Sequence, residues 1–303
     1  MDSTRLALLR ELADRGSVAA VATALNISPS AVSQQLATLQ AGIPVPLTTR
    51  SGRRLVLTEA GEALAVAATR VQEAIASAHG AVEAFLDRPE RAVTVSAFHS
   101  AGIALFAPLL AEVAGRVDLN LVDADVANDE FLALTADCDL VIAHRLAHDP
   151  DWPRDRHVAV PLLVEPLDIA MHETHPLASR ASIAPEQLRD ERWISTHAGF
   201  PLAGVLQQLG GRSGSAPRIE HRINEFSLAA QVVRTGAAIA VMPRVTGAAL
   251  AVDGMVLRPI EGDPIVRHVD VLARPDALAL PSVRLVLDAL RTVAAGVREK
   301  AEP

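Results

Sequence analysis

The chain has 303 residues, half of them apolar, and a formal net charge of −8. This length suits two or three domains, and no segment is long and apolar enough to cross a bilayer. The N-terminus lacks the basic-then-apolar pattern of a signal peptide, so we expect a cytoplasmic protein. The single cysteine, Cys138, excludes an internal disulfide framework and a multi-cysteine zinc site.

Charge is placed unevenly along the chain. Residues 1–57 contain six arginines and three carboxylates, which gives +3 and leaves −11 for the remainder. A small basic segment on an acidic body fits a protein that contacts nucleic acid with one end only.

The first forty residues predict three helices. Residues 4–14 form an amphipathic helix that supports the next two. Ser17 suits the N-cap of the second helix. After a short break, Ser28 suits the N-cap of the third, and Pro29 its first turn, where no N–H is needed. Two capped helices with a tight turn between them are the layout of a helix-turn-helix, whose second helix enters the major groove of DNA.

A short hairpin is expected after these helices. Residues 47–57 contain two extended runs around the turn Ser51-Gly52, and three arginines crowd it. Such a wing meets phosphates or the minor groove. Capped helix pairs also occur in proteins that do not bind DNA, but the arginines favour DNA binding. The residues expected to contact DNA are Ser17, Ser28, Pro29, Ser30, Ser33, Gln34, Gln35, Thr38, Arg50, Arg53 and Arg54.

Residues 58–86 predict one long helix, which Thr58 can cap. Its apolar positions alternate in steps of four and three and form a heptad seam: Leu64, Ala68, Val71, Ile75, Ala78, Val82 and Phe85. The seam needs a partner, either within its own domain or in a second copy. We favour dimerisation, because two recognition helices can then read two half-sites of a near-palindrome. The charged segment 87–91 is the expected hinge to the rest of the chain.

From Ala92 onward, strand patterns alternate with helices. The first set has the strands AVTVSAF, VDLNLV, LVIAH and VAVPLLV, with helices at about 100–114 and 129–135. The second has LDIAM, WIST, RIEHRI and AIAVM, with helices near 185–189, 201–209 and 226–234. The strand VDVLA and a helix near 283–297 close the chain. This alternation predicts parallel sheets covered on both faces. Crossing strands near 163–168 and 265–273 would join two lobes with a cleft between them.

Several runs of sequence resemble LysR-type transcriptional regulators over essentially the full length. SPSAVSQQLATL and TRSGRRLVLTEAG resemble their N-terminal domain, and EPLDIAMHETHPLAS and AAQVVRTGAAIAVMP resemble their effector domain. The resemblance implies an α+β multi-domain chain. A winged helix-turn-helix would occupy 1–58 and a dimerisation helix with its hinge 59–90. A two-lobed α/β domain like type 2 periplasmic binding proteins would occupy 91–303, with lobe 1 at about 91–164 plus 269–303 and lobe 2 at about 165–268.

The chain departs from the family pattern between the third helix and the wing. Most members have a Leu-Glu pair, then a glycine, then a Leu-Phe pair; here Gln40, Pro44 and Thr48 replace the Glu, the Gly and the Phe. Proline is tolerated in a loop where no N–H is needed. We therefore expect the fold to survive, and the angle of the wing stays open.

Loops after strand ends are the expected effector site, because open α/β lobes bind ligands there. Their hydroxyls and N–H groups could hold a carboxylate or another anion, Arg145 could neutralise it, and Phe98 and Phe200 could supply apolar walls. Ordinary capped loops are the alternative. The candidate residues are Phe98, His99, Ser100, Ala101, His144, Arg145, Ser195, Thr196, His197, Phe200, Asn224 and Phe226.

The sequence thus predicts a sequence-specific, effector-controlled transcriptional regulator rather than an enzyme. No nucleophile elbow, Walker loop or dinucleotide glycine pattern is present, and the histidines show no metal-ligand spacing. The expected partners are double-stranded DNA with a near-palindromic site, a small effector, and a second copy of the chain. The resemblance also implies a homotetramer and contact with RNA polymerase. Neither a cofactor nor a membrane is expected. Two alternatives are an α/β binding or enzymatic module with a non-functional DNA head, and a constitutive regulator with a closed cleft.

Overall fold

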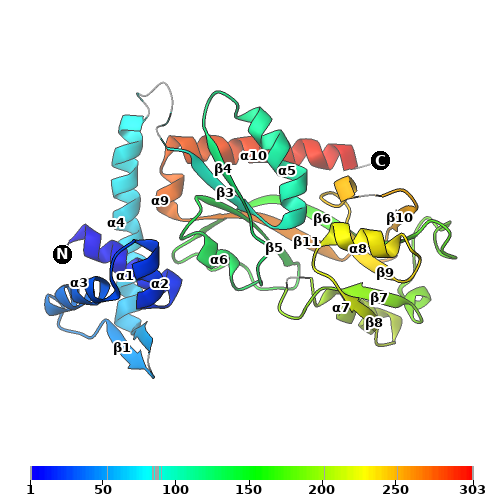
Figure 1. The fold of residues 1–303 in the computed structure, drawn as a ribbon, viewed down its shortest axis with the longest axis horizontal. Coiled ribbons are helices and arrows are strands. Elements are labelled where there is room, and N and C mark those ends of the chain that lie inside the picture. Colours follow the sequence, from blue (N-terminus) through cyan, green and yellow to red (C-terminus); the bar gives the residue numbers. More distant parts are fainter. Residues whose placement is uncertain are drawn as a thin grey trace.

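The computed structural model describes residues 2–52, 54–83, 85, 89, 91–200, 202–250 and 252–301. A small helical head at the N-terminus lies beside a larger, elongated α/β body, and a long helix runs from the head past the near end of the body (Figure 1). No helix in the described ranges is long and apolar enough to span a membrane. Of the expected hinge, Asp87, Arg88 and Glu90 lie outside the described residues, as does the wing residue Arg53.

The head is the expected winged helix-turn-helix. Its elements are α1 (Ser3–Arg15), α2 (Val18–Ala24), α3 (Pro29–Ala41), β1 (Thr48–Ser51) and β2 (Arg54–Leu57). The hydroxyl of Ser17 accepts a hydrogen bond from the N–H of Ala20, and that of Ser28 from the N–H of Ala31, each at 3.1 Å. Both predicted N-caps are therefore confirmed, and leucines from α1 and α3 fill the small core.

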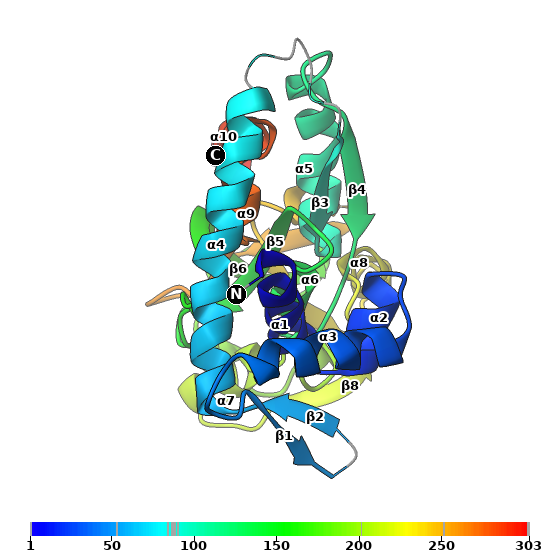
Figure 2. The ribbon, with the colours of Figure 1, turned by 90° about the vertical axis from the view of Figure 1, so that its left-hand side faces the viewer.

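Helix α4 (Glu59–Glu83) runs along both parts of the molecule (Figure 2). Thr58 caps it by accepting from the N–H of Gly61 at 3.1 Å, and the Thr58 hydroxyl also donates to the Pro46 carbonyl at 2.6 Å. The first half of α4 packs on α1 through Ala65 and Ala68. Further along, Gly80 packs against the backbone after α9 (Pro275–Leu278) in the body.

One sheet of nine strands runs through both lobes of the body, in the order β4-β3-β5-β11-β6-β9-β7-β8, with β10 beside β6. The strands are β3 (Val93–Ala97), β4 (Leu119–Asp123), β5 (Leu140–Leu146), β6 (Val158–His172), β7 (Arg192–Ser195), β8 (Arg218–Arg222), β9 (Ile239–Pro243), β10 (Met255–Arg258) and β11 (Val266–Ala273). The expectation of parallel sheets is wrong in part. Strand β11 is antiparallel to β5 and β6, and β6 is antiparallel to β9 and β10.

The two crossing segments are confirmed, but the runs VAVPLLV and LDIAM form one strand. Glu165 and Pro166 lie between the two runs, and Asp168 lies within the second. Both carboxylates are matched by an arginine, Arg267 at 2.6 Å and Arg244 at 2.7 Å, so the strand continues through the body. Strand β6 can therefore pair with β11 in lobe 1 and with β9 and β10 in lobe 2.

Helices and short 3-10 turns cover the sheet. They are α5 (His99–Glu112), α6 (Phe131–Leu134), η1 (Pro185–Leu188), α7 (Val205–Ser213), α8 (Phe226–Val233), η2 (Ala248–Leu250), α9 and α10 (Pro281–Ala301). The helix expected at about 100–114 begins at His99, with Phe98 at its N-cap. The helix expected near 201–209 runs from Val205 to Ser213 and contains Gly210-Gly211. Gly214, with φ of 70°, ends α7 in the left-handed conformation that glycine adopts without strain.

Candidate DNA-binding surface and effector pocket

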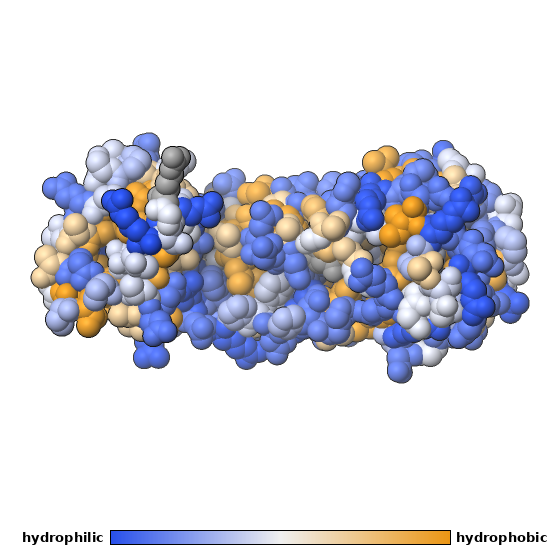
Figure 3. Space-filling view, turned by 90° about the horizontal axis from the view of Figure 1, so that it is seen from below, coloured by the Kyte–Doolittle hydropathy of each residue, from blue (hydrophilic) through white to orange (hydrophobic). Residues whose placement is uncertain are grey.

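Polar residues of α3 and the wing share one concave surface of the head. Ser17, Pro29, Ser33, Arg50 and Arg54 line a hollow between the start of α3 and the hairpin. Ser28, Ser30, Gln34, Gln35 and Thr38 are exposed on α3 outside that hollow. Seen from below, the head end of the molecule carries hydrophilic side chains around the tip of the wing (Figure 3).

Several of these hydroxyls already have local partners. Ser33 donates to the Pro29 carbonyl at 2.9 Å and Thr38 to the Gln34 carbonyl at 2.8 Å. The Gln35 side-chain oxygen accepts from Arg5 at 3.0 Å. Among the described residues, the exposed Gln34 side chain has no hydrogen-bond partner, so its amide is free to donate and to accept.

Gln40 fixes the loop that leads to the wing. Its amide nitrogen donates to the carbonyls of Ile43 at 3.1 Å and Val45 at 2.8 Å, and its oxygen accepts from the Leu47 N–H at 2.7 Å. A glutamate could not make the two donations, because a carboxylate only accepts. Gln40 therefore compensates for the departure at Pro44, and the connection to the wing is stiff.

The heptad seam of α4 is divided between two environments. Ala68 is fully buried inside the head and is not available to a second helix, while Leu64 and Val71 pack partly on the head core. Ile75, Ala78, Val82 and Phe85 are exposed, Val82 by 66% and Phe85 by 90%. The second half of the helix thus presents an apolar face outward.

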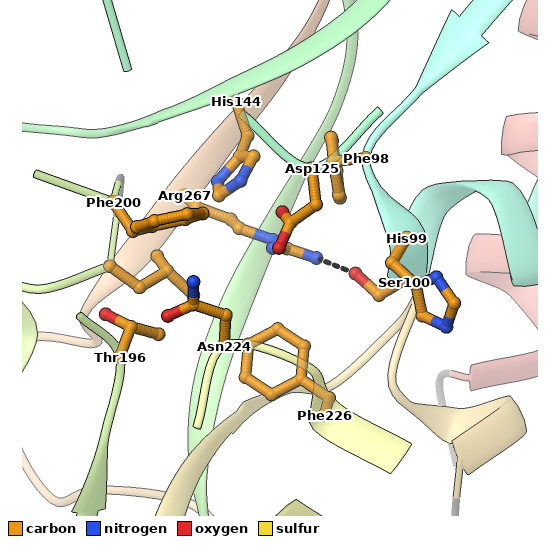
Figure 4. A pocket seen from close by; sticks show the side chains of 11 residues that line it. Phe98, His99, Ser100, Asp125, His144, Thr196, Phe200, Asn224, Phe226 and Arg267 are labelled. Atoms are coloured by element: carbon orange, nitrogen blue, oxygen red, sulfur yellow. Dashed lines mark hydrogen bonds between the residues drawn. The ribbon is translucent and has the colours of Figure 1, made fainter. Parts of the chain in front are cut away.

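A cavity lined by residues of both lobes lies where the two lobes meet (Figure 4). Lobe 1 contributes the start of α5 and the end of β5, and lobe 2 contributes the loop after β7 and the start of α8. The lining residues are Phe98, His99, Ser100, Asp125, His144, Thr196, Phe200, Leu202, Asn224, Phe226 and Arg267.

Arg267 is a fully buried cation at this cavity. Its Nε donates to Glu165 at 2.6 Å, and its Nη2 donates to Thr246 at 2.6 Å and to Ser100 at 3.1 Å. The guanidinium also lies over the ring of Phe98, 4.9 Å from its centroid. Its Nη1 is buried without a hydrogen-bond partner in the described part of the chain. A buried donor without a partner is costly, so a ligand atom that accepts from Nη1 would be stabilised.

Neutral polar groups surround the guanidinium. His144 is buried, with its ring centroid 4.3 Å from that of Phe98. Burial, together with the charge of Arg267, holds the pKa of His144 well below its usual value, so the imidazole is neutral. His144 Nδ1 and the Thr196 hydroxyl are buried and have no partner among the described residues. The cavity therefore offers one cation and at least two further hydrogen-bonding atoms.

The mouth of the cavity is acidic. His99 lies between the lobes, 3.1 Å from Asp123 of lobe 1 and 3.3 Å from Glu225 of lobe 2. Burial raises the pKa of the Asp125 carboxyl, and Asp123 and Glu225 raise it further, against the opposing effect of His99 and Arg267. The cavity therefore has negative charge at its mouth and positive charge at its inner end.

Most of the expected effector residues meet in this cavity. Those that line it are Phe98, His99, Ser100, His144, Thr196, Phe200, Asn224 and Phe226. Four do not. Ala101 is buried in lobe 1, and Ser195 lies in a neighbouring hollow. The His197 N–H donates to Asn224 at 2.8 Å, and Arg145 pairs with Asp151 at 2.7 Å.

Arg145 does not line the cavity; the cation that does is Arg267, which the sequence did not single out. Arg145 lies near Asp270 of the neighbouring strand, with its Nε 3.5 Å from that carboxylate. Arg267 follows Val266 at the start of an apolar strand, and that isolated arginine was the available signal. Asp125 and Leu202 also line the cavity without having been expected.

A second hollow continues into lobe 2 and shares Thr196, Leu202 and Phe226 with the first. Its other lining side chains are mostly aliphatic: Ile194, Ser195, Val205, Leu206, Ile223, Ala229, Ala240 and Val241. Beyond the charged part of the cavity, the space is therefore apolar.

A winged helix-turn-helix joined to a two-lobed α/β body with a buried polar cavity defines a class, the DNA-binding regulators that respond to a small molecule. Two family models match the chain, the "Bacterial regulatory helix-turn-helix protein, lysR family" over residues 3–62 and the "LysR substrate binding domain" over residues 86–295. The chain belongs to the LysR family of transcriptional regulators, which are not enzymes.

Its similarity to individual relatives is distant but extends over most of each chain. The regulator CbbR of Xanthobacter flavus is 28% identical over 299 residues, which cover 94% of this chain and 86% of CbbR. The uncharacterized regulator YybE of Bacillus subtilis is 24% identical over 251 residues, covering 82% of this chain and 84% of YybE.

Solved structures share the fold. Full-length OxyR from Pseudomonas aeruginosa has a TM-score of 0.67 at 20% identity, with 96% of this chain and 95% of OxyR covered. Full-length CbnR in complex with its target DNA has a TM-score of 0.54 at 21% identity, with 97% and 100% covered.

Proposed function

We propose that this LysR-family regulator reads a near-palindromic DNA site as a homodimer, with α3 on the bases and the wing arginines on phosphates. The exposed side chain of Gln34 carries the assignment to bases, because its amide can donate and accept at one base edge. Arg50 and Arg54 line the hollow beside α3, where the backbone of a duplex would pass.

The exposed second half of the α4 seam supports the dimer. Val82 and Phe85 present apolar surface that a second α4 would bury, and the paired helices would set the distance between two heads. The family resemblance further supports a tetramer of two dimers, contact with RNA polymerase and work in the cytoplasm. We retain the division into a DNA-binding part (1–58), a linker (59–90) and a two-lobed effector part (91–303) as part of this proposal.

We also propose that the effector is an anion with an apolar body, such as a small carboxylate. The single observation behind this proposal is the buried Nη1 of Arg267 without a partner. The N-terminus of α5 at the same wall adds a second preference for negative charge. The rings of Phe98, Phe200 and Phe226 and the apolar hollow in lobe 2 would hold the rest of the molecule.

DNA reading is tested by anisotropy titrations on DNA from the region upstream of the gene, against a scrambled duplex. Gln34→Ala should lower the preference for the matched sequence. Arg50→Ala combined with Arg54→Ala should weaken binding to every sequence and lower the salt slope by roughly one per lost contact. The matched control is Arg116→Ala, an exposed arginine of the body. Sequence preference that survives all three head substitutions would remove the assignment.

The effector class is tested by thermal shift with benzoate, 3-phenylpropanoate and hexanoate, each at about 10 mM, beside the matching alcohols. An acid should raise the melting temperature where its alcohol does not, and Arg267→Gln should abolish the difference. Equal shifts with acid and alcohol, or no shift with any of the three acids, would contradict the anion proposal.

A further inference from the structure

The head rests on the body through a cluster of ion pairs, which we call the head clamp: Glu11 and Asp14 of α1 with Arg156 and Arg274 of the body. Arg274 donates to Glu11 at 2.6 Å and to Asp14 at 2.5 Å, and Arg156 donates to Asp14 at 3.0 Å. The side chain of Asp14 is 2% exposed and that of Arg274 is 8% exposed. Breaking one side of such a buried pair is strongly destabilising, so the clamp holds the head in one orientation.

Both arginines of the clamp lie at the ends of the lobe-crossing strands. Arg156 precedes β6 by two residues, and Arg274 directly follows β11. The two strands are antiparallel, with Ala273 opposite Val158 at the end nearest the clamp.

The other end of the same strand pair holds the effector cavity. Arg267 of β11 stands directly opposite Glu165 of β6, and their side chains form the buried ion pair. Between Arg267 and Arg274 lie seven residue steps, or about 23 Å of strand at about 3.3 Å per residue. One pair of strands thus links the cavity to the head.

We propose that the β6–β11 strand pair couples the effector cavity to the DNA-binding head through the head clamp. This inference rests on the proposed function and adds how the cavity would regulate DNA binding. A ligand atom that accepts from Arg267 Nη1 competes with Glu165 for the guanidinium charge. This competition weakens the ion pair that joins β6 and β11 at that end. The clamp is thereby loosened, and the head can leave the one orientation in which the clamp holds it. The ligand acts only if it binds one orientation better than another.

The pairing of β6 with β11 is irregular at one point, where the twist of the two strands can change. The register of β11 against β6 shifts between Val269 and Asp270, as in a bulge, which locally increases twist. The indole N–H of Trp152 donates to Asp270 at 2.8 Å and fixes the carboxylate there. A weakened ion pair at Arg267 would therefore shift Arg274 by changing the twist of the two strands. The register of β11 against β6 would stay the same.

Hydrogen–deuterium exchange on the full-length protein tests the coupling without DNA or effector. The measured segments are α1 and residues 275–280, which lie on the two sides of the contact. Asp14→Asn should raise exchange in both segments by about tenfold, because local opening becomes easier when the clamp is weakened. Glu165→Gln, at the far end of the strands, should raise exchange in the same two segments.

The matched control is Asp168→Asn. Asp168 lies on the same strand three residues beyond Glu165 and is also a buried carboxylate paired with an arginine, but it faces β9 in lobe 2. It should leave α1 and residues 275–280 at wild-type exchange. The double variant Asp14→Asn with Glu165→Gln should exceed Asp14→Asn alone by less than about twofold, because both changes act on one contact.

Two results would overturn the proposal. One is wild-type exchange in Asp14→Asn. The other is a Glu165→Gln effect on the clamp segments no greater than that of Asp168→Asn, which would leave the clamp a static contact. If Asp14→Asn does not fold, the neighbouring ion pair of the same contact serves instead: Arg10→Asp should loosen it by removing the bond to Asp276 at 2.9 Å, and adding Asp276→Arg should restore protection. A protein without DNA sequence preference would contradict the proposed function, independently of these exchange results.

Discussion

Arg267 of β11 and Glu165 of β6 form an ion pair in which both side chains are fully buried, with Nε 2.6 Å from Oε1. The carboxylate also accepts from the N–H groups of Val245 at 3.1 Å and Thr246 at 2.8 Å, so it is held from lobe 2 as well. The pair therefore joins the cavity to the strands that connect the lobes.

Removing one partner of this pair should be costly. Arg267→Gln leaves Glu165 buried without its counter-charge, and we expect the free energy of unfolding to fall by about 3–5 kcal/mol. Urea denaturation followed by circular dichroism measures the change. Arg291→Gln, which breaks the exposed pair with Asp288, should cost less than about 1 kcal/mol. A similar loss of unfolding free energy in the two variants would mean that the buried pair stabilises the body no more than the exposed pair does.

The neutral state of His144 makes stability depend on pH. Its pKa is about 6.5 in the unfolded chain and well below that in the fold. Below pH 6.5 the unfolded state therefore binds the extra proton, and stability is lost as the pH falls. The slope from this one group is about 1.4 kcal/mol per pH unit until the pKa in the fold is reached.

His144→Gln removes that contribution. Urea denaturation of wild type and variant between pH 8 and 5 should show a constant difference above about pH 7.5, where the imidazole is neutral in both states. Below about pH 6.5 the wild type should lose stability more steeply than the variant. Parallel curves over the whole range would show that His144 takes up a proton in the fold as readily as in the unfolded chain.

The sequence allowed the head to be predicted closely, because its signals are local. The hydroxyl caps at Ser17 and Ser28 and the turn at Ser51-Gly52 each act within a few residues. The cavity was predicted less completely. Loop residues such as Phe98 and Asn224 follow from the strand-end rule, but Arg267 depends on which charged strand residues face each other across β6 and β11. That pairing is non-local and leaves no periodic trace in the sequence.

The continuous strand β6 shows the same limit. The interpretation as two strands, VAVPLLV and LDIAM, leaves an interruption at Glu165 and Pro166. The interruption disappears once Arg267 and Arg244 are brought alongside, and both come from segments far along the chain. Charged residues within an apolar run therefore marked the hinge between lobes rather than the end of a strand.

The amide of Gln40 should be required for the wing. Gln40→Glu keeps the size of the side chain but cannot donate to the carbonyls of Ile43 and Val45. We expect a loss of about 1–3 kcal/mol in the stability of the head and weaker binding to every DNA sequence. Gln34→Glu, on the exposed face of the same helix, is the control for stability alone. An unchanged urea midpoint for Gln40→Glu would show that the loop does not depend on this side chain.

Gly61 lets α4 approach the root of the wing. A Cβ at position 61 would lie 2.0 Å from the Leu47 carbonyl oxygen and 3.2 Å from the Leu57 Cβ, so backbone must move to admit it. We expect Gly61→Ala to destabilise the head by about 1–3 kcal/mol, despite the better helix propensity of alanine. Gly296→Ala in α10 is the matched control, because a Cβ there meets nothing within 4 Å.

Gly296→Ala should instead stabilise the protein by about 0.5–1 kcal/mol, the ordinary gain for alanine over glycine within a helix. Thermal and urea unfolding of the two variants, with exchange of the wing amides as a local readout, separates the effects. The two substitutions make the same chemical change in the two long helices, so opposite signs would isolate the close approach to Leu47. A stabilised Gly61→Ala variant would show that α4 and the wing are further apart than the structure has them.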